Sequence, residues 1–289
     1  MSSNLSRRAR SYSRPVPDFD RRSEMKRVAI VLVGHGSRIA EANQSFLELA
    51  DQVRRRTDGL VEPAFVELAE PTIPQALERA VRRGAEEIVI APFLLLAAGH
   101  AKVDIPTHVE AARARFTSVR FTQAAPLGLH PLMVEILSDR ITQAQSAAPE
   151  RAASDTAVLL LGRGSSDPDA NSDIYKLGRL LWERRGLATV ECAFCGVVEP
   201  SLPQGLRKLS RLPYRRVIVA PYLFFSGVLV RRIETALANF RQECPETEAL
   251  CAPTLGDDPR LLDVLFLRVR EAREGLTRMS CDLCKYKVG

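Results

Sequence analysis

The sequence is poor in aromatic residues and contains no long apolar run. Aromatic side chains make up 6% of its 289 residues. The longest apolar stretch, residues 88–99, falls short of the roughly 20 residues that a membrane-crossing helix needs. Basic residues are spread along the chain, without the aromatic-interleaved patch or the module typical of nucleic-acid binding. We therefore expect a protein that neither crosses a membrane nor binds nucleic acid.

Cysteine is also scarce, and a signal segment is missing. Six cysteines in a chain of this length do not indicate a disulfide framework, and no apolar segment opens the sequence. These features predict a cytoplasmic protein. Residues 1–25 are rich in Ser and Arg and predict a disordered tail. The formal net charge of +6 favours acidic partners without identifying them.

The most informative feature is a long internal repeat, because a repeat constrains the fold more than local propensity does. Gly34 corresponds to Gly162 and Pro131 to Pro259, so the spacing is nearly constant. The matching pairs of segments are 32–37 and 160–165, 67–77 and 196–206, 87–96 and 216–225, and 126–133 and 254–261. Two copies of one domain follow.

The repeat predicts the domain organisation. We expect a first lobe over 26–146, a second lobe over 154–272 and a tail over 273–289, with a surface connection within 143–155. In each copy short Val, Ile and Leu runs alternate with helical periodicity, which is typical of α/β lobes with a small parallel sheet and helices on both faces. In the first copy we expect strands near 27–33, 61–68, 87–95 and 118–124, and helices over 39–53 and from Thr72 to Gly84.

Ligands in such sheets bind at the carboxyl ends of the strands. His35 follows the first predicted strand, Glu70 the second and His100 the third. Neutral imidazole binds Co, Ni, Fe and Zn, and two histidines leave the coordination shell open, as a metal that must be handed on requires. Glycines on both sides of His35 would allow a sharp turn and the close approach of a flat ligand. The alternative is that both histidines are ordinary loop residues.

The second copy lacks both histidines and has Arg163 and Val228 in their places. We expect the first lobe to hold the metal and the second to supply a basic wall. The candidates for binding substrate carboxylates are Arg163, Arg231, Arg232, Arg38 and Lys102. The remaining histidines, His108 and His130, are expected to be structural or on the surface.

The cysteines fall into two groups. Cys281 and Cys284 form a Met-x-Cys-x-x-Cys arrangement in the tail, which is half of an iron–sulfur site. Cys192 and Cys195 lie three positions apart on a predicted strand, so their side chains should face opposite sides of the sheet in the core. We expect Cys244 and Cys251 to be structural as well.

The segments VLVGHGSR, FVELAEPTIPQAL and IVIAPFLLLAAGHAKVDIP resemble the sirohydrochlorin chelatase family of class II tetrapyrrole chelatases, in its long two-domain cobaltochelatase form. The resemblance covers residues 26–270 and implies a cleft between two α/β lobes where a divalent metal enters sirohydrochlorin. It makes His35 the proton acceptor and a metal ligand, and His100 the second ligand. The residues that it places against the macrocycle are Glu70, Leu94, Leu95, Leu96, Ala97, Ala98 and Gly99.

The resemblance favours a lyase that inserts Co²⁺ for cobalamin biosynthesis. The nearest alternative is ferrochelation for siroheme, and Ni²⁺ is a further candidate for the inserted metal. The resemblance to some long members also implies a 4Fe-4S cluster at Cys281 and Cys284. The expected state is a monomer or a homodimer. A non-catalytic two-lobed metal or tetrapyrrole carrier remains open. A histidine phosphatase fits less well, because its motif has Arg directly before His-Gly, where this chain has Gly34.

Overall fold

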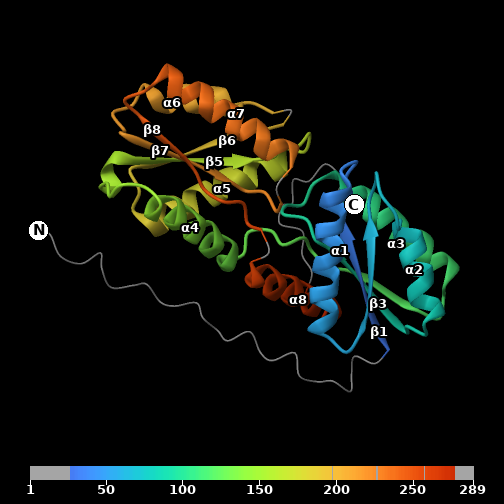
Figure 1. Cartoon of the computed structure of the whole chain (residues 1–289). Coiled ribbons are helices and arrows are strands. Elements are labelled where there is room, and N and C mark those ends of the chain that lie inside the picture. The colour runs from blue at the N-terminus through green and yellow to red at the C-terminus, as the bar shows by residue number, and fades with distance from the viewer. Residues whose placement is uncertain (1–26, 197, 226, 257, 277–289) are drawn as a thin grey trace, which may run out of the picture.

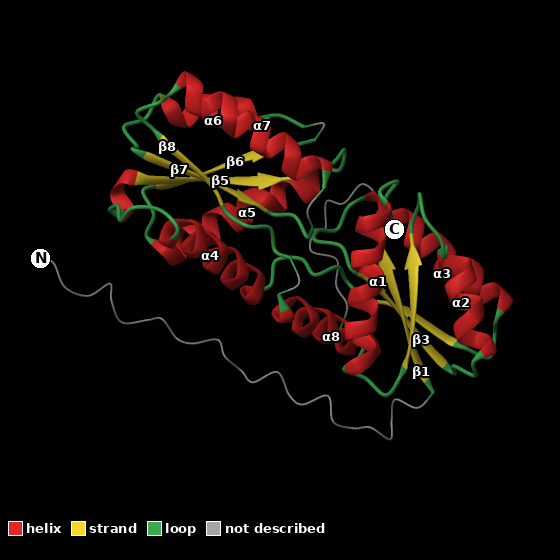
Figure 2. Ribbon diagram, in the orientation of Figure 1, coloured by secondary structure: helices red, strands yellow, loops and turns green. Residues whose placement is uncertain are grey.

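The computed structural model describes residues 27–196, 198–225, 227–256 and 258–276. Two four-stranded parallel sheets form two lobes (Figures 1 and 2). The first repeat contains β1 Val28–Gly34, α1 Ala40–Arg55, β2 Leu60–Phe65, α2 Ile73–Arg82, β3 Glu87–Pro92, a π-helix η2 His100–Asp104, α3 Ile105–Arg115, β4 Arg120–Gln123 and α4 Pro131–Ser146. The second contains a 3₁₀ turn η3 Ala153–Asp155, β5 Thr156–Gly162, α5 Pro168–Arg185, β6 Thr189–Phe194, α6 Leu202–Ser210, β7 Arg216–Pro221, α7 Val228–Glu243, β8 Glu248–Cys251 and α8 Pro259–Arg273.

The sheets have equivalent strand orders, β2-β1-β3-β4 and β6-β5-β7-β8. Every residue of β1 is buried, as expected of a central parallel strand with helices on both faces. Val28, Ile30 and Leu32 belong to the core on one face, and Ala29 and Val31 to the core on the other. The predicted α/β duplication is therefore confirmed.

Local signals set several helix boundaries. The Thr72 hydroxyl and the Gln75 side chain form a reciprocal capping box at the start of α2, with Pro74 in the first turn. Past its end, Gly84 adopts a left-handed conformation with φ of +84°. Ser201 and Gln204 form the same box at α6, so the repeat extends to its caps.

The last helix of each repeat packs on the other repeat's sheet. Helix α4 follows β4 of the first repeat but lies against β7 and β8, whereas α8 follows β8 and lies against β3 and β4. Figure 1 shows α4 beneath the second sheet and α8 beside α1. The ion pair from Arg56 to Asp263, at 2.9 Å, fixes α8 to α1.

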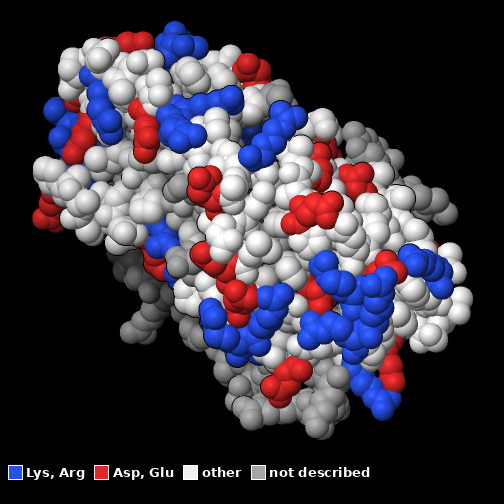
Figure 3. Space-filling view, turned by 45° about the vertical axis from the view of Figure 1, so that its right-hand side comes forward, with Lys and Arg blue, Asp and Glu red and all other residues white. Residues whose placement is uncertain are grey.

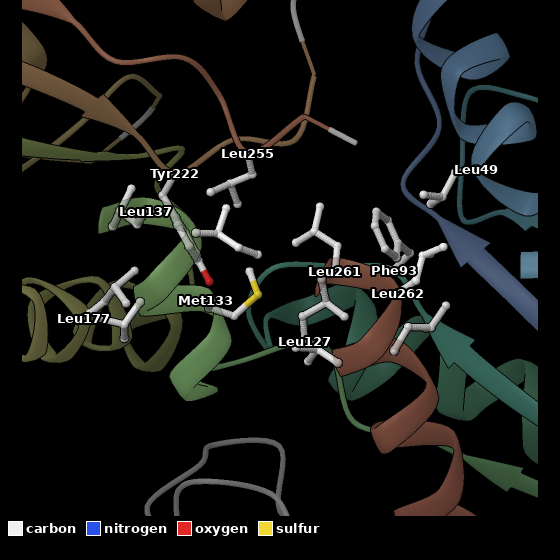
Figure 4. Packing of buried hydrophobic residues seen from close by; sticks show 14 of the residues in the cluster. Leu49, Phe93, Leu127, Met133, Leu137, Leu177, Tyr222, Leu255, Leu261 and Leu262 are labelled. Carbon is white, nitrogen blue, oxygen red and sulfur yellow. The ribbon is translucent and has the colours of Figure 1, made fainter. Parts of the chain in front are cut away.

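This exchange joins the two lobes through one hydrophobic core. The cluster includes Leu49 from α1, Phe93 just after β3, Tyr222 just after β7, and Met133 and Leu261 from the exchanged helices. Figure 4 shows these side chains converging between the lobes. Because each lobe depends on a helix from the other repeat, separating them would expose one apolar face of each sheet.

The excess of basic residues does not gather in one place on the face shown in Figure 3. Lys and Arg side chains occupy several separate areas there, with Asp and Glu between them. No helix in the described part of the chain is long and apolar enough to span a bilayer. The predicted tails, residues 1–25 and the Cys281–Cys284 segment, lie outside the described residues.

Candidate metal and substrate site

His35 lies at the carboxyl end of β1, where the backbone turns sharply. Gly36 has φ of +90°, a conformation that favours glycine. A Cβ atom on Gly36 would lie 1.8 Å from the carbonyl oxygen of Glu67, and one on Gly34 would lie 2.8 Å from the Phe46 ring. The predicted turn is confirmed. The two glycines, however, make room for the protein itself, namely for the Glu67 backbone and the Phe46 side chain.

The loop after β2 is bound to the loop after β1 along the backbone. The amide of Glu67 donates to the carbonyl of His35 at 3.1 Å, and the amide of Val66 donates to that of Gly34 at 2.9 Å. Leu68, the next residue, is exposed and has a positive φ of 62°, which is costly outside glycine. These contacts hold the Glu67 side chain beside His35.

His35, Glu67 and His100 form a three-residue cluster. One ligand atom from each lies within 4.8 Å of the others. Oε1 of Glu67 is 3.7 Å from Nδ1 of His35 and 4.0 Å from Nε2 of His100. Two ligand atoms about 2.1 Å from a shared ion lie at most about 4.2 Å apart. The two separations to Glu67 fall within that limit, whereas the cluster as a whole spans up to 4.8 Å, so a small movement of the side chains would let all three hold one divalent ion.

His100 begins the π-helix η2, a rare element that is frequent at functional sites. Its Nδ1 lies 2.6 Å from Oδ2 of Asp104. This contact favours the tautomer with the proton on Nδ1, which leaves Nε2 as the metal-binding nitrogen. The rings of His35 and His100 meet edge to face with centroids 4.7 Å apart. The predicted pair of imidazoles is therefore brought together.

The environment of His35 favours its neutral form. Burial lowers the pKa of its imidazole below the ordinary value of 6.5, and the positive charge of Arg163 lowers it further. A hydrogen bond to the Gly36 carbonyl and the charge of Glu67 act in the opposite direction without reversing the shift. Neutral imidazole can bind a metal or accept a proton, whereas imidazolium can do neither.

The third member of the cluster is Glu67, whereas the sequence pattern had pointed to Glu70. Strand β2 ends at Phe65, three residues before the predicted end, so Glu67 lies in the loop and not in the strand. Glu70 is exposed and precedes the cis bond to Pro71, and the equivalent Glu199–Pro200 bond in the metal-free repeat is also cis. The contact of Glu70 with a macrocycle stays a prediction.

A cleft of about 890 Å³ opens in front of the cluster, between the lobes. Its lining includes His35 and His100, but an apolar surface forms much of it. Phe93 and Phe224 stack there with ring centroids 4.5 Å apart. From the predicted substrate loop, the lining residues are Leu94, Leu95, Leu96, Ala98 and Gly99, while Ala97 is not among them. A flat apolar face and a few convergent polar groups are typical of a ligand site.

The second lobe supplies the opposite wall, and its described residues include no metal cluster. Arg163 stands where the first lobe has His35, Gly196 where it has Glu67, and Val228 where it has His100. Arg163 and Arg232 line the cleft with exposed guanidinium groups, in line with the predicted basic wall. Arg38 and Arg231 are exposed but do not line it.

The expectation that Lys102 binds substrate carboxylates is wrong. Its side chain is 1% exposed, and Nζ lies 2.9 Å from Asp167 and 2.8 Å from Asp169. Burial acts to lower the pKa of Lys102, but the bonds to the two carboxylates outweigh burial and raise it. The charge is therefore already neutralised within the protein.

The other histidines and cysteines have structural surroundings. Nδ1 of His130 accepts a hydrogen bond from the Leu132 amide and caps α4, while His108 lies half-buried within α3. Cys192 and Cys195 pack in the cores on opposite faces of the second sheet, as predicted. Burial raises the pKa of the Cys192 thiol to about 12, so it is not reactive. Cys244 and Cys251 pack against the same core as Cys195.

Comparison with known proteins agrees with this geometry. The CbiX family model matches residues 29–144 and 157–272. A sirohydrochlorin cobaltochelatase of Priestia megaterium is 38% identical over 90% of this chain and 85% of its own length. A sirohydrochlorin ferrochelatase of the same organism is 35% identical over 75% of this chain and 81% of its own length.

Solved structures of sirohydrochlorin chelatases also resemble this chain. SirB from Bacillus subtilis with Fe³⁺ is 30% identical and superposes with a TM-score of 0.77 over 86% of this chain and 98% of its own. The sirohydrochlorin chelatase SirB of Bacillus subtilis subspecies spizizenii in complex with cobalt gives a TM-score of 0.72 at the same identity, over 86% of this chain and 96% of its own. The chain therefore belongs to the CbiX family of sirohydrochlorin chelatases, in its two-lobed form.

Proposed function

We propose that this protein inserts a divalent metal ion into sirohydrochlorin, with Co²⁺ as the leading substrate metal. The observation that carries the proposal is the cluster of His35, Glu67 and His100 within 4.8 Å of one another. The cluster lies at the mouth of a cleft with an apolar stacked surface. The metal is a substrate in this reaction, so an incomplete set of protein ligands is an advantage, because the ion must leave.

Metal insertion requires the removal of two protons from pyrrole nitrogens. His35 is held neutral by burial and by Arg163, so it can accept one of these protons near neutral pH, and the other leaves to solvent through the open cleft. Glu67 and Nε2 of His100 remain as ligands for the ion while His35 takes up that proton. A ligand set of two imidazoles and one carboxylate also keeps a net positive charge on the bound ion, which favours its transfer to the deprotonated macrocycle.

The cleft walls suit a flat polycarboxylate. Phe224, which stacks on the buried Phe93, can contact the macrocycle face together with the side chains of Leu94, Leu95 and Leu96. Arg163 and Arg232 on the opposite wall can bind peripheral carboxylates through their guanidinium groups. Glu70 and the loop Leu94–Gly99 are proposed as further macrocycle contacts.

The choice of metal follows from the more similar of two relatives. The cobaltochelatase of Priestia megaterium is 38% identical and the ferrochelatase 35%, and imidazole ligands do not discriminate strongly between Co²⁺ and Fe²⁺. An iron–sulfur cluster at Cys281 and Cys284 and a cytoplasmic location stay predictions.

The test is metal insertion measured anaerobically by the absorbance of the macrocycle, with Co²⁺ and Fe²⁺ supplied separately. We expect faster insertion of Co²⁺, and a large preference for Fe²⁺ would reverse the assignment of the metal. His35→Ala and His100→Ala should each reduce insertion about a hundredfold or more, because each removes a ligand or the base. Binding of both substrates without metallated product would favour the carrier over the enzyme.

A further inference from the structure

A buried ion cluster joins the two lobes beside the metal site. Lys102 comes from the π-helix η2 of the first lobe, and its Nζ contacts Oδ2 of Asp167 at 2.9 Å and Oδ2 of Asp169 at 2.8 Å. Both carboxylates come from the start of α5 in the second lobe. The side chains of Lys102, Asp167 and Asp169 are 1%, 4% and 12% exposed, so the contact is almost dry.

The cluster is fixed on the second lobe by the helix start itself. Oδ1 of Asp167 accepts a hydrogen bond from the amide of Asp169 and caps α5, while its other oxygen binds Lys102. One carboxylate thus serves both the helix and the contact between lobes. The two carboxylates are therefore held rigidly at the start of α5, and any movement of Lys102 away from them would leave buried charge unpaired.

On the first lobe the same π-helix carries His100, two residues before Lys102. The amide of Ile105 donates to the carbonyl of His100, and the carbonyl of Ala101 accepts a bond from Gln123 at 2.7 Å. The first bond lies within the π-helix, and the second, from Gln123 of β4, attaches the helix to its own sheet. Lys102 attaches it to the opposite lobe, so the position of His100 depends on both lobes.

Among the residues that the structure describes, the second repeat has no equivalent contact. Helix α7 begins directly at Val228, the counterpart of His100, with no π-helix before it. When the two repeats are aligned, the charged residue nearest to the position of Lys102 is Arg231, and the residue that corresponds to Asp169 is Glu41. No ion pair joins these two described residues, and both are exposed. The contact between lobes is therefore built only on the side that carries the histidines.

A buried ion pair is weak evidence for stability, because desolvation offsets much of the attraction. We propose that Lys102, with Asp167 and Asp169, is a positioning residue that holds His100 in register with His35 and Glu67 for the metal ion. This inference rests on the proposed function of the cluster. It adds two carboxylates of the second lobe to the determinants of metal affinity, although neither carboxylate contacts the ion.

The experiment compares Lys102→Met with Arg216→Met in the full chain, using Co²⁺ alone as the probe. Arg216 is a matched control, because it is also 1% exposed and paired, with Glu248, at the start of β7 and thus at the end of the sheet away from the cleft. Both variants should lower the melting temperature. Only Lys102→Met should weaken Co²⁺ binding, by about tenfold or more, and alter the visible absorption of the bound ion.

The outcomes separate the inference from the proposed function. If the parent protein binds no Co²⁺, the proposed function fails and this inference fails with it. If the parent and Lys102→Met bind Co²⁺ equally, the ion cluster is merely structural and the inference alone is overturned. If Lys102→Met does not fold, Asp169→Asn takes its place in the experiment, because this variant keeps the contact between Lys102 and Asp167. It should weaken Co²⁺ binding several-fold, and binding equal to the parent would overturn the inference.

Discussion

Phe93 of the first repeat stacks on Phe224 of the second, with ring centroids 4.5 Å apart and ring planes inclined by 22°. The pair lies where the two lobes meet and lines the cleft in front of the metal cluster. It therefore belongs both to the packing between the lobes and to the proposed surface for the macrocycle.

Replacing Phe224 with Ala should affect binding of the macrocycle more than binding of the metal. The lost aromatic contact should cost about 1 kcal/mol of stability, and the KM for sirohydrochlorin should rise because the flat surface is interrupted. The Kd for Co²⁺ should stay at the parent value, since Phe224 is not a ligand. Steady-state kinetics and direct Co²⁺ titration measure the two effects, and an unchanged KM would remove this pair from the substrate surface.

Replacing Gly36 with Ala should disrupt the metal site through the backbone. The new Cβ would lie 1.8 Å from the Glu67 carbonyl oxygen, so the loop that carries Glu67 must move. We expect Co²⁺ affinity to fall about tenfold or more. Gly84→Ala is the matched control, because Gly84 also has a positive φ but no atom within 4 Å of the added Cβ. That variant should lose about 1 kcal/mol of stability and bind Co²⁺ normally.

Glu67→Gln and Glu70→Gln distinguish the two carboxylates of the loop after β2. Removing the charge of Glu67 should weaken Co²⁺ binding about tenfold or more, because its Oε1 lies 3.7 Å and 4.0 Å from the two imidazoles. Glu70→Gln should leave Co²⁺ binding unchanged. The comparison requires only calorimetric titration of both variants with Co²⁺. The opposite ranking would show that the structure-based choice of Glu67 is wrong.

The imidazole of His35 should titrate below 6.5 in the metal-free protein. Burial and Arg163 lower its pKa, so the unfolded chain binds the proton more tightly than the folded chain does. Stability therefore falls as the pH drops from about 6.5 through the lowered pKa of His35. Arg163→Met should raise that pKa toward the ordinary value, whereas Arg232→Met should not. NMR titration of the imidazole proton measures the shift, and equal pKa values in all three proteins would contradict this account.

How well the sequence predicted the site depended on where each strand ends. The runs of Val, Ile and Leu located the carboxyl ends of β1 and β3, so His35 and His100 were found. In the segment after β2 apolar residues continue to Leu68, interrupted only by Glu67, although the strand ends at Phe65. Glu67 was therefore read as a strand residue. The close contact of Glu67 with Gly36, which brings Glu67 to the histidines, joins the loops that follow two different strands and leaves no local pattern in the sequence.

By itself the sequence determined the duplication, the parallel α/β lobes, the helix caps and the two imidazoles. Each of these depends on periodicity or on short-range chemistry that repeats along the chain. Only the tertiary structure decided that α4 and α8 exchange sheets, because an apolar helix face specifies that it is buried but not against which sheet. It also decided that Lys102 is bound to Asp167 and Asp169 and does not face the substrate. A lysine is the same in sequence whether its partner is solvent, a ligand or a carboxylate brought in by the other lobe.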